Sequence, residues 1–298
     1  MNSYCETLEK ARAFVKRLTN KTANKALTDL ARAFTSACFE SDTDIDKFIS
    51  SYDEDEIFDP NCLFGNHDNV YDYVLPKYRK IAKILFEYRP IGLGTPQAMV
   101  GEGELMCLAM SPRVGIAKKK NTGDITVDDA PIEMKGEQVR IMGDITGIEL
   151  QTRAKSLAKE FGIKPNTCTR NRKAYEPWGM SPSKISHWQN EFKEIGKPEA
   201  VEFLSLLFDA PKARFTGCWT DGWFDAELLN KVILKMLFRQ MEKLWEAFTI
   251  IESDGRIVSI TADPDEFDRM VDDDVIYVTG DYIRSFQPVK IGLYCKRV

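Results

Sequence analysis

Two acidic residues and a lysine lie on two short segments whose composition is typical of β-strands. Asp124 belongs to Gly-Asp-Ile-Thr-Val, and Glu133 and Lys135 belong to Pro-Ile-Glu-Met-Lys. Side chains alternate between the two faces of a strand, so Glu133 and Lys135 share one face while Ile132 and Met134 share the other. The Asp-rich segment between the strands can turn the chain and bring Asp124 against this pair. The sequence therefore predicts a hairpin with three charged groups on one side.

This set of charges suits the chemistry of a divalent metal beside a phosphodiester. A hard cation with oxygen ligands would compensate the two carboxylates. A bound metal lowers the pKa of a water molecule and offsets charge on the phosphate, and a fixed ammonium adds electrostatic stabilisation on the order of a few kcal/mol. The alternative is a surface hairpin with ordinary polar alternation, because an acid followed by Glu-x-Lys is a short pattern.

A further carboxylate and a group of cations precede the hairpin. Residues 100–110 are typical of a helix entered through glycines, with Glu104 near its start. An acid at a helix N-terminus gains from the helix dipole and is placed to complete a metal shell. Arg113 and then Lys118, Lys119 and Lys120 follow, and this basic loop could lie against a phosphate backbone.

In chain order, Gly-Glu-Gly-Glu on a helix, Gly-Asp on a strand and Ile-Glu-Met-Lys-Gly on the next strand resemble the PD-(D/E)XK nuclease superfamily, the restriction-endonuclease-like enzymes. The resemblance covers about residues 98–143. Gly123 stands where the family often has proline. The resemblance implies an α/β (α+β) fold: a restriction-endonuclease-like core with a mixed central β-sheet flanked by helices, together with an N-terminal helical region.

The same resemblance implies roles for four side chains. Asp124 and Glu133 match the acids that bind the metal, and Lys135 matches the lysine that orients the attacking water and steadies the developing charge. Glu104 matches the helix glutamate that often supports a second metal. The implied cofactor is Mg²⁺, for which Mn²⁺ can substitute.

The charge of the chain is acidic overall, yet cations gather near the predicted site. A net charge of -5 and a pI near 5.4 argue against a generic nucleic-acid coat. A DNA enzyme needs only a local basic surface, although such residues are also common as plain solvated charge. The candidate DNA contacts are Lys118, Lys119, Lys120, Arg140, Arg170, Arg172 and Lys173.

Several classes of protein are disfavoured by composition. No run of eighteen apolar residues occurs, and the polar N-terminus is unlike a secretion signal, so we expect no membrane association. Seven scattered cysteines and two histidines disfavour structural zinc and indicate a reducing, cytoplasmic setting. The glycines at 92 and 94 have no preceding strand and no following Gly-Lys-Ser/Thr, so we expect no nucleotide cofactor.

Periodicity predicts an N-terminal helical region at residues 1–66 and a catalytic domain at residues 67–298, which becomes rich in strands from about residue 248. These last strands either complete the central sheet or form a separate lobe. The acidic, turn-rich stretch at 51–69 is the predicted boundary, and its acids are expected to be solvated surface. Helices are predicted at 4–39, 71–88, 147–161, 183–194, 198–208 and 224–248.

The function expected from these features is a metal-dependent endodeoxyribonuclease, first of all a type II restriction-type enzyme. A phage-encoded or repair nuclease is the alternative within that class. A non-catalytic structural or DNA-binding protein on a nuclease-like scaffold is the alternative from another class, and an enzyme acting on RNA is a third. Cutting both strands of a duplex symmetrically calls for two sites, so a homodimer is expected.

Overall fold

The structure is a computed structural model, and it describes residues 3–19, 34, 39, 42–87, 103–117, 123–135, 139–168, 174–179, 181–241, 245–252, 254–282 and 290–297. The chain forms two compact units. The first contains residues 1–137 and 243–262, and the second contains residues 138–242 and 263–298. Both sides of the predicted boundary at residue 66 therefore lie in the first unit.

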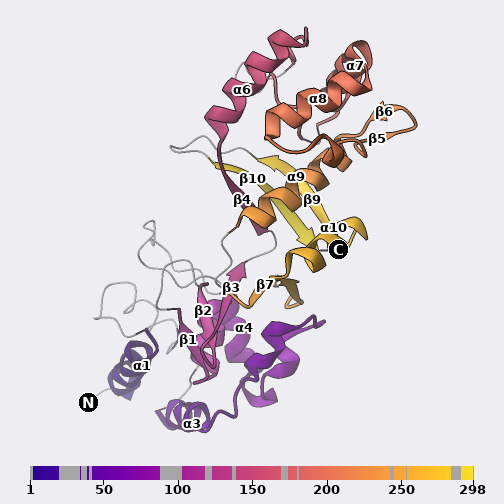
Figure 1. The fold of residues 1–298 in the computed structure, drawn as a ribbon. Coiled ribbons are helices and arrows are strands. Elements are labelled where there is room, and N and C mark those ends of the chain that lie inside the picture. Colours follow the sequence, from indigo (N-terminus) through magenta and orange to yellow (C-terminus); the bar gives the residue numbers. More distant parts are fainter. Residues whose placement is uncertain are drawn as a thin grey trace. The chain divides into compact units, whose positions relative to one another are not determined.

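The first unit is built on a five-stranded mixed sheet flanked by helices (Figure 1). The strands, in their order across the sheet, are β1 (Val114–Ile116), β2 (Ile125–Val127), β3 (Ala130–Lys135), β7 (Ala247–Ile251) and β8 (Ile257–Thr261). Neighbouring strands are antiparallel except for β3 and β7, which run parallel. The predicted mixed α/β class and the mixed sheet are thus confirmed.

A turn joins β2 to β3 within the Asp-rich segment where the sequence predicts one, and it comprises two residues because Ala130 and Pro131 already belong to β3. Asp128 and Asp129 have φ angles of 49° and 69°, and Val127 and Ala130 are register partners on either side. Two central residues with positive φ match the right-handed twist of a hairpin, and aspartate tolerates this conformation because its short side chain can bond locally. The local sequence alone therefore sets the register of the hairpin.

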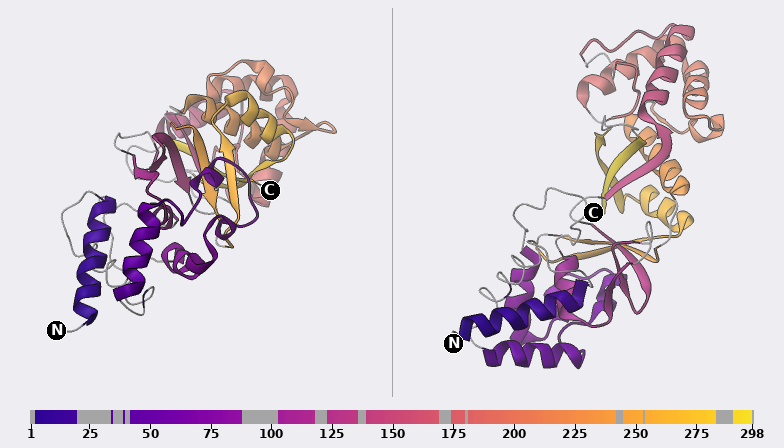
Figure 2. Two further views of the ribbon diagram at one scale, coloured as in Figure 1. Left: turned by 90° about the horizontal axis from the view of Figure 1, so that it is seen from below. Right: turned by 90° about the vertical axis from the view of Figure 1, so that its left-hand side faces the viewer.

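Four helices belong to the described part of the first unit: α1 (Ser3–Thr19), α3 (Asp42–Asp53), α4 (Arg79–Glu87) and α5 (Glu104–Met110). Figure 2 shows α1 and α3 side by side. Aromatic side chains hold them together, since the Phe14 ring lies 5.8 Å from that of Phe48 and 5.0 Å from that of Tyr52, both edge to face. Edge-to-face pairs stabilise beyond their buried area.

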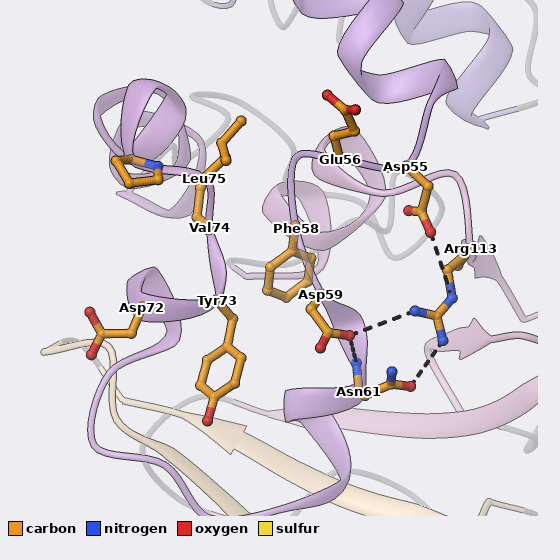
Figure 3. A pocket seen from close by; sticks show the side chains of 11 residues that line it. Asp55, Glu56, Phe58, Asp59, Asn61, Asp72, Tyr73, Val74, Leu75 and Arg113 are labelled. Carbon is orange, nitrogen blue, oxygen red and sulfur yellow. Dashed lines mark hydrogen bonds and ion pairs between the residues drawn. The ribbon is translucent and has the colours of Figure 1, made fainter.

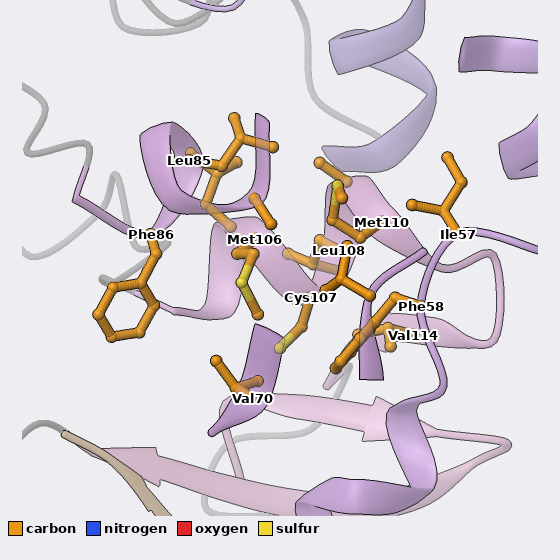
Figure 4. Close-up of a cluster of buried hydrophobic side chains, with 14 of the residues drawn as sticks. Ile57, Phe58, Val70, Leu85, Phe86, Met106, Cys107, Leu108, Met110 and Val114 are labelled. Atoms are coloured by element: carbon orange, nitrogen blue, oxygen red, sulfur yellow. The ribbon is translucent and has the colours of Figure 1, made fainter. Parts of the chain in front are cut away.

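Helix α5 is the centre of the hydrophobic core of this unit. Every residue from Leu105 to Met110 is buried, so only Glu104 at its start is partly exposed. Figure 4 shows Met106, Cys107 and Met110 among the surrounding apolar side chains. A helix that is apolar on all sides must be enclosed by other elements, and this enclosure fixes the position of its N-terminal end.

The helix predicted at 71–88 is shorter in the structure. Two 3₁₀ turns, Val70–Tyr73 and Pro76–Tyr78, precede α4, which starts only at Arg79. Pro76 has no N–H to donate and clashes with the preceding turn of a helix, so a helix can begin at this proline but not run through it. A third 3₁₀ turn, Pro60–Phe64, lies in the predicted loop at 51–69.

The second unit combines a three-stranded antiparallel sheet with helices. Its strand order is β4 (Val139–Thr146), β10 (Lys290–Arg297) and β9 (Ile276–Tyr282). Its helices are α6 (Gly147–Glu160), α7 (Pro182–Ile195), α8 (Lys197–Phe208), α9 (Ala226–Gln240) and α10 (Pro264–Asp272). A small hairpin of β5 (Trp219–Thr220) and β6 (Trp223–Phe224) precedes α9.

The C-terminal strands divide between the two expected arrangements, completion of the first sheet and formation of a separate one. β7 and β8 complete the sheet of the first unit, whereas β9 and β10 pair with β4 in the second. The helix predicted at 224–248 ends at Gln240, so residues 247–251 form β7 in place of a last helical turn. No helix within the described ranges is both long and apolar enough to cross a bilayer.

Candidate functional site

The three charged side chains predicted to meet on the hairpin form one cluster. Asp124 stands immediately before β2, while Glu133 and Lys135 occupy alternate positions on β3. The Lys135 Nζ atom lies 2.8 Å from Asp124 Oδ2 and 2.6 Å from Glu133 Oε1. A single ammonium group therefore bridges both carboxylates.

Strand alternation places the cluster on the accessible face of the hairpin. Ile132 and Met134 are 0 % and 3 % exposed on the core side. The side chains of Asp124, Glu133 and Lys135 are 31 %, 24 % and 37 % exposed. The three groups are thus open to solvent and to a ligand, yet they are sheltered enough for their interactions to exceed those of a fully solvated ion pair.

Buried apolar residues border the cluster along β7. Phe248 and Ile250 are the register partners of Glu133 and Lys135 in the parallel pair, and they are 3 % and 1 % exposed. Apolar neighbours lower the local dielectric constant, which strengthens the attraction between the charges of the site.

Asp124 is fixed to β3 at two points. Its backbone N–H donates to the Ile132 carbonyl at 2.9 Å. The backbone N–H of Met134 donates to Asp124 Oδ2 at 3.0 Å. The carboxylate is therefore oriented by the backbone of the strand that carries the other two charges, so the cluster does not depend on side-chain pairing alone.

Lys135 makes a third contact, from Nζ to the Met134 carbonyl oxygen at 3.0 Å. Burial alone would lower the pKa of Lys135, but the hydrogen bonds to Asp124 and Glu133 outweigh it and raise the pKa above its usual value. The side chain is therefore a cation held against three oxygen atoms.

Gly123 sets the direction from which the chain enters the site. Its φ angle is 101°, and a Cβ atom added there would lie 2.6 Å from the Ile132 carbonyl oxygen. Proline, with φ fixed near about −65°, cannot adopt this backbone. Glycine at this position is thus a requirement of this backbone, because no other residue fits so close to β3.

We expect Gly123→Ala to displace Asp124, because the added methyl group meets strand backbone that cannot move aside. The matched control is Gly162→Ala, where φ is 71° but no atom lies within 4 Å of the added Cβ. Both changes place a side chain at a positive φ, which costs about 1–2 kcal/mol at the 71° of Gly162 and no less at the 101° of Gly123. Denaturant unfolding should show an additional loss of about 1 kcal/mol for Gly123→Ala. Equal losses for the two variants would contradict the steric argument.

Glu104 begins α5 and is half-buried. A Cβ on the preceding Gly103 would lie 3.5 Å from Met134 Cε and 3.6 Å from Ile251 Cδ1. The helix therefore starts beside β3 and β7. In the described part of the chain, no three acidic, histidine or cysteine side chains are grouped as ligands of one metal ion. The role of Glu104 as a further ligand stays a prediction.

The residues predicted to contact DNA are placed only in part. Arg140 lies in β4 of the second unit, where its register partner is Tyr294 of β10. The other six lie outside the described residues: Lys118, Lys119, Lys120, Arg170, Arg172 and Lys173. Phosphate contact by any of these residues stays a prediction.

Arg113, by contrast, is engaged within the protein. It donates to Asp128 at 2.6 Å. It also donates to Asn61 at 2.9 Å and lies 3.6 Å from Asp59 (Figure 3). Its hydrogen bonds lower the pKa of the Asp128 carboxyl. These partners engage the guanidinium within the protein, and the expectation that Arg113 belongs to a DNA-facing basic surface stays a prediction.

A pocket of about 470 Å³ lies beside this arginine, a feature that sequence reasoning did not find. Its lining includes four carboxylates, from Asp55, Glu56, Asp59 and Asp72 (Figure 3). Three of these acids belong to the 51–69 stretch, whose acids were expected as solvated surface, and only the fold brings Asp72 and Arg113 to the same pocket.

Comparison with known proteins adds no relative, since no family model, no curated protein and no solved structure matches the chain.

Proposed function

We propose that this protein is a metal-dependent deoxyribonuclease that hydrolyses phosphodiester bonds at the cluster of Asp124, Glu133 and Lys135. The observation that carries the proposal is the convergence of both carboxylates on one cation, at 2.8 Å and 2.6 Å. These residues are separated in sequence and meet through strand pairing, with the amide of Met134 holding Asp124 in place.

The donor atoms around Lys135 fit a hard divalent cation. Asp124 Oδ2, Glu133 Oε1 and the Met134 carbonyl oxygen all lie within 3.0 Å of one positive centre. Oxygen ligands of this kind suit Mg²⁺ and Mn²⁺, whereas zinc prefers sites with nitrogen or sulfur. When bound, the metal would supply Lewis acidity at the phosphate and a more acidic bound water.

The residues of the chain would contribute orientation and charge. Asp124 and Glu133 would hold the cation, and Asp124 is already oriented by the backbone before any ligand arrives. Lys135 would place a positive charge beside the phosphate oxygens as negative charge develops there. Preorganised electrostatic groups of this kind supply a large part of the rate enhancement in many enzymes.

The order of the elements supports a restriction-endonuclease-like core as part of the same proposal. Helix α5 with Glu104, the strand after Asp124 and the strand with Glu133 and Lys135 follow one another in the sequence and lie in one unit. We infer a type II restriction-type endonuclease first, acting as a homodimer on duplex DNA, and a phage or repair nuclease second.

A second candidate is a non-catalytic structural or DNA-binding protein on the same scaffold. It is favoured by the fact that Lys135 already pairs with both acids, which leaves the cluster with a single net negative charge. Calorimetric titration separates the two candidates, since a purely structural cluster takes up neither Mg²⁺ nor Mn²⁺.

Cleavage of plasmid and linear DNA tests the proposed enzyme. We expect the protein to nick or cut both substrates in Mg²⁺ or Mn²⁺ and to stop when EDTA is added. Asp124→Ala should abolish cutting, whereas Asp46→Ala removes a surface acid that pairs with Lys10 and should leave it unchanged. Metal-independent cutting, or equal rates in the two variants, would rule out this site.

A further inference from the structure

The ammonium of Lys135 stands where the proposed metal would have to bind. An ammonium carries three N–H donors. The Nζ atom of Lys135 has three oxygen acceptors: Asp124 Oδ2 at 2.8 Å, Glu133 Oε1 at 2.6 Å and the Met134 carbonyl at 3.0 Å. The donors of the lysine are thus matched by the oxygen atoms that make up the cation site.

We propose that Lys135 is the resident cation of this site, and that a divalent metal binds only by displacing its ammonium group from Asp124 and Glu133. The inference rests on the proposed function and adds to it a second role for Lys135. The lysine would set the metal affinity of the site as well as assist the reaction.

Simultaneous occupation is opposed by distance and charge. Mg²⁺ binds oxygen at about 2.1 Å, while the ammonium lies within 2.8 Å of both carboxylate oxygens. Two cations sharing these oxygen atoms would be separated by only about 4 Å, a distance at which a divalent ion and an ammonium repel one another strongly. Metal binding through Asp124 Oδ2 and Glu133 Oε1 and the observed position of Nζ therefore exclude one another.

The lysine can leave without disturbing the strand. It is the last residue of β3, and its side chain is 37 % exposed, so the flexible four-carbon stem has solvent to turn into. The carboxylate of Asp124 would stay in place because the Met134 N–H holds it independently of Lys135. The exchange thus moves one side chain and leaves the ligands oriented.

Removal of the Lys135 ammonium should affect metal binding and DNA cleavage in opposite directions. The apparent metal affinity is low when only a small fraction of the molecules can accept the metal. A lysine bound to the two carboxylates keeps that fraction small. Removing the ammonium should strengthen metal binding while it removes the cation that assists the reaction.

Calorimetric titration of the full chain with Mn²⁺ tests the exchange. We expect Lys135→Met and Lys135→Gln to bind Mn²⁺ about tenfold more tightly than the wild type. Lys135→Arg keeps the charge and should not gain affinity. The matched control is Lys10→Met, which removes an ammonium 2.6 Å from Asp46 in the same unit and should leave the affinity unchanged.

The outcomes distinguish the exchange from the proposed function. Unchanged or weaker Mn²⁺ binding in both Lys135→Met and Lys135→Gln overturns the exchange, although a wild type that binds and cleaves would keep its assignment as a nuclease. Absence of Mn²⁺ binding in the wild type and in all variants overturns both. Thermal unfolding checks that each variant is folded. If Lys135→Met does not fold, the Mn²⁺ titration of Lys135→Gln carries the test.

Discussion

Replacing Asp124 with asparagine should lower kcat for DNA cleavage by about a thousandfold while the protein stays folded. Asparagine has nearly the same shape as aspartate, and its carbonyl oxygen can still accept the hydrogen bond from the Met134 N–H, 3.0 Å away in the structure. What it lacks is the negative charge that pairs with Lys135 and that would bind the metal. The expected loss of kcat therefore reports the removal of the negative charge and not a change in the shape of the side chain.

The comparison with Asp129→Asn makes this result specific. Asp129 is an exposed acid in the turn of the same hairpin, with a φ of 69° that asparagine also tolerates. Cleavage time courses at saturating DNA and several Mg²⁺ concentrations should show the control at the wild-type rate. If Asp124→Asn regains full kcat at high Mg²⁺, then the acid only binds the metal and does not act in the transition state. A kcat equal to that of the control at every concentration would contradict the site.

The hairpin of the candidate site was predictable because everything that determines it is local. Alternation with period two assigns Glu133 and Lys135 to one face, and adjacent aspartates allow the positive φ angles of the turn. The register of the strands then brings Asp124 to the other two charges. Few long-range contacts are needed for this step, so a single sequence suffices.

The completion of the sheet was not predictable in the same way. β7 pairs with β3 although residues 138–242, which form most of the second unit, lie between the two strands in the sequence. A strand pattern does not indicate its partner, so the sequence left open whether the last strands join the central sheet or form another lobe. The parallel pairing decides this, and it supplies the apolar border at Phe248 and Ile250.

Backbone geometry set two further limits on prediction. Gly123 has a φ of 101° and lies close to the carbonyl of Ile132, and both features exist only in the folded hairpin. The end of α9 at Gln240 was missed because the apolar periodicity of the helix continues into Leu244 and Trp245 and on to β7. Apolar residues on the core side of a helix and in a buried strand give the same pattern over a short stretch.

The largest effect on stability is expected at a buried ion pair in the second unit. The Lys184 Nζ atom lies 3.3 Å from Glu176 Oε2, and the two side chains are only 5 % and 1 % exposed. Gln151 Nε2 donates to the other carboxylate oxygen of Glu176 at 2.9 Å, and Lys184 also donates to the Trp178 carbonyl. Removal of one partner leaves a charge without its counter-ion in a medium that solvates it poorly.

Lys184→Met should therefore destabilise the second unit by about 3–5 kcal/mol, because the carboxylate of Glu176 stays buried. The double variant with Glu176→Gln should recover most of the loss, since the amide is neutral and can still accept from Gln151. The control is Lys164→Met, whose ion pair with Glu194 has the same 3.3 Å length but side chains 69 % and 64 % exposed.

Urea unfolding followed by tryptophan fluorescence measures these changes, since four of the five tryptophans, at 178, 188, 219 and 223, lie in the second unit. The control should lose at most about 1 kcal/mol, as is usual for solvated ion pairs. A double variant no more stable than Lys184→Met would mean that the loss comes from the packing of the lysine stem. Recovery in the double variant would instead assign the loss of stability to the unpaired charge. DNA cleavage measured in parallel should be unchanged at temperatures where each variant is folded.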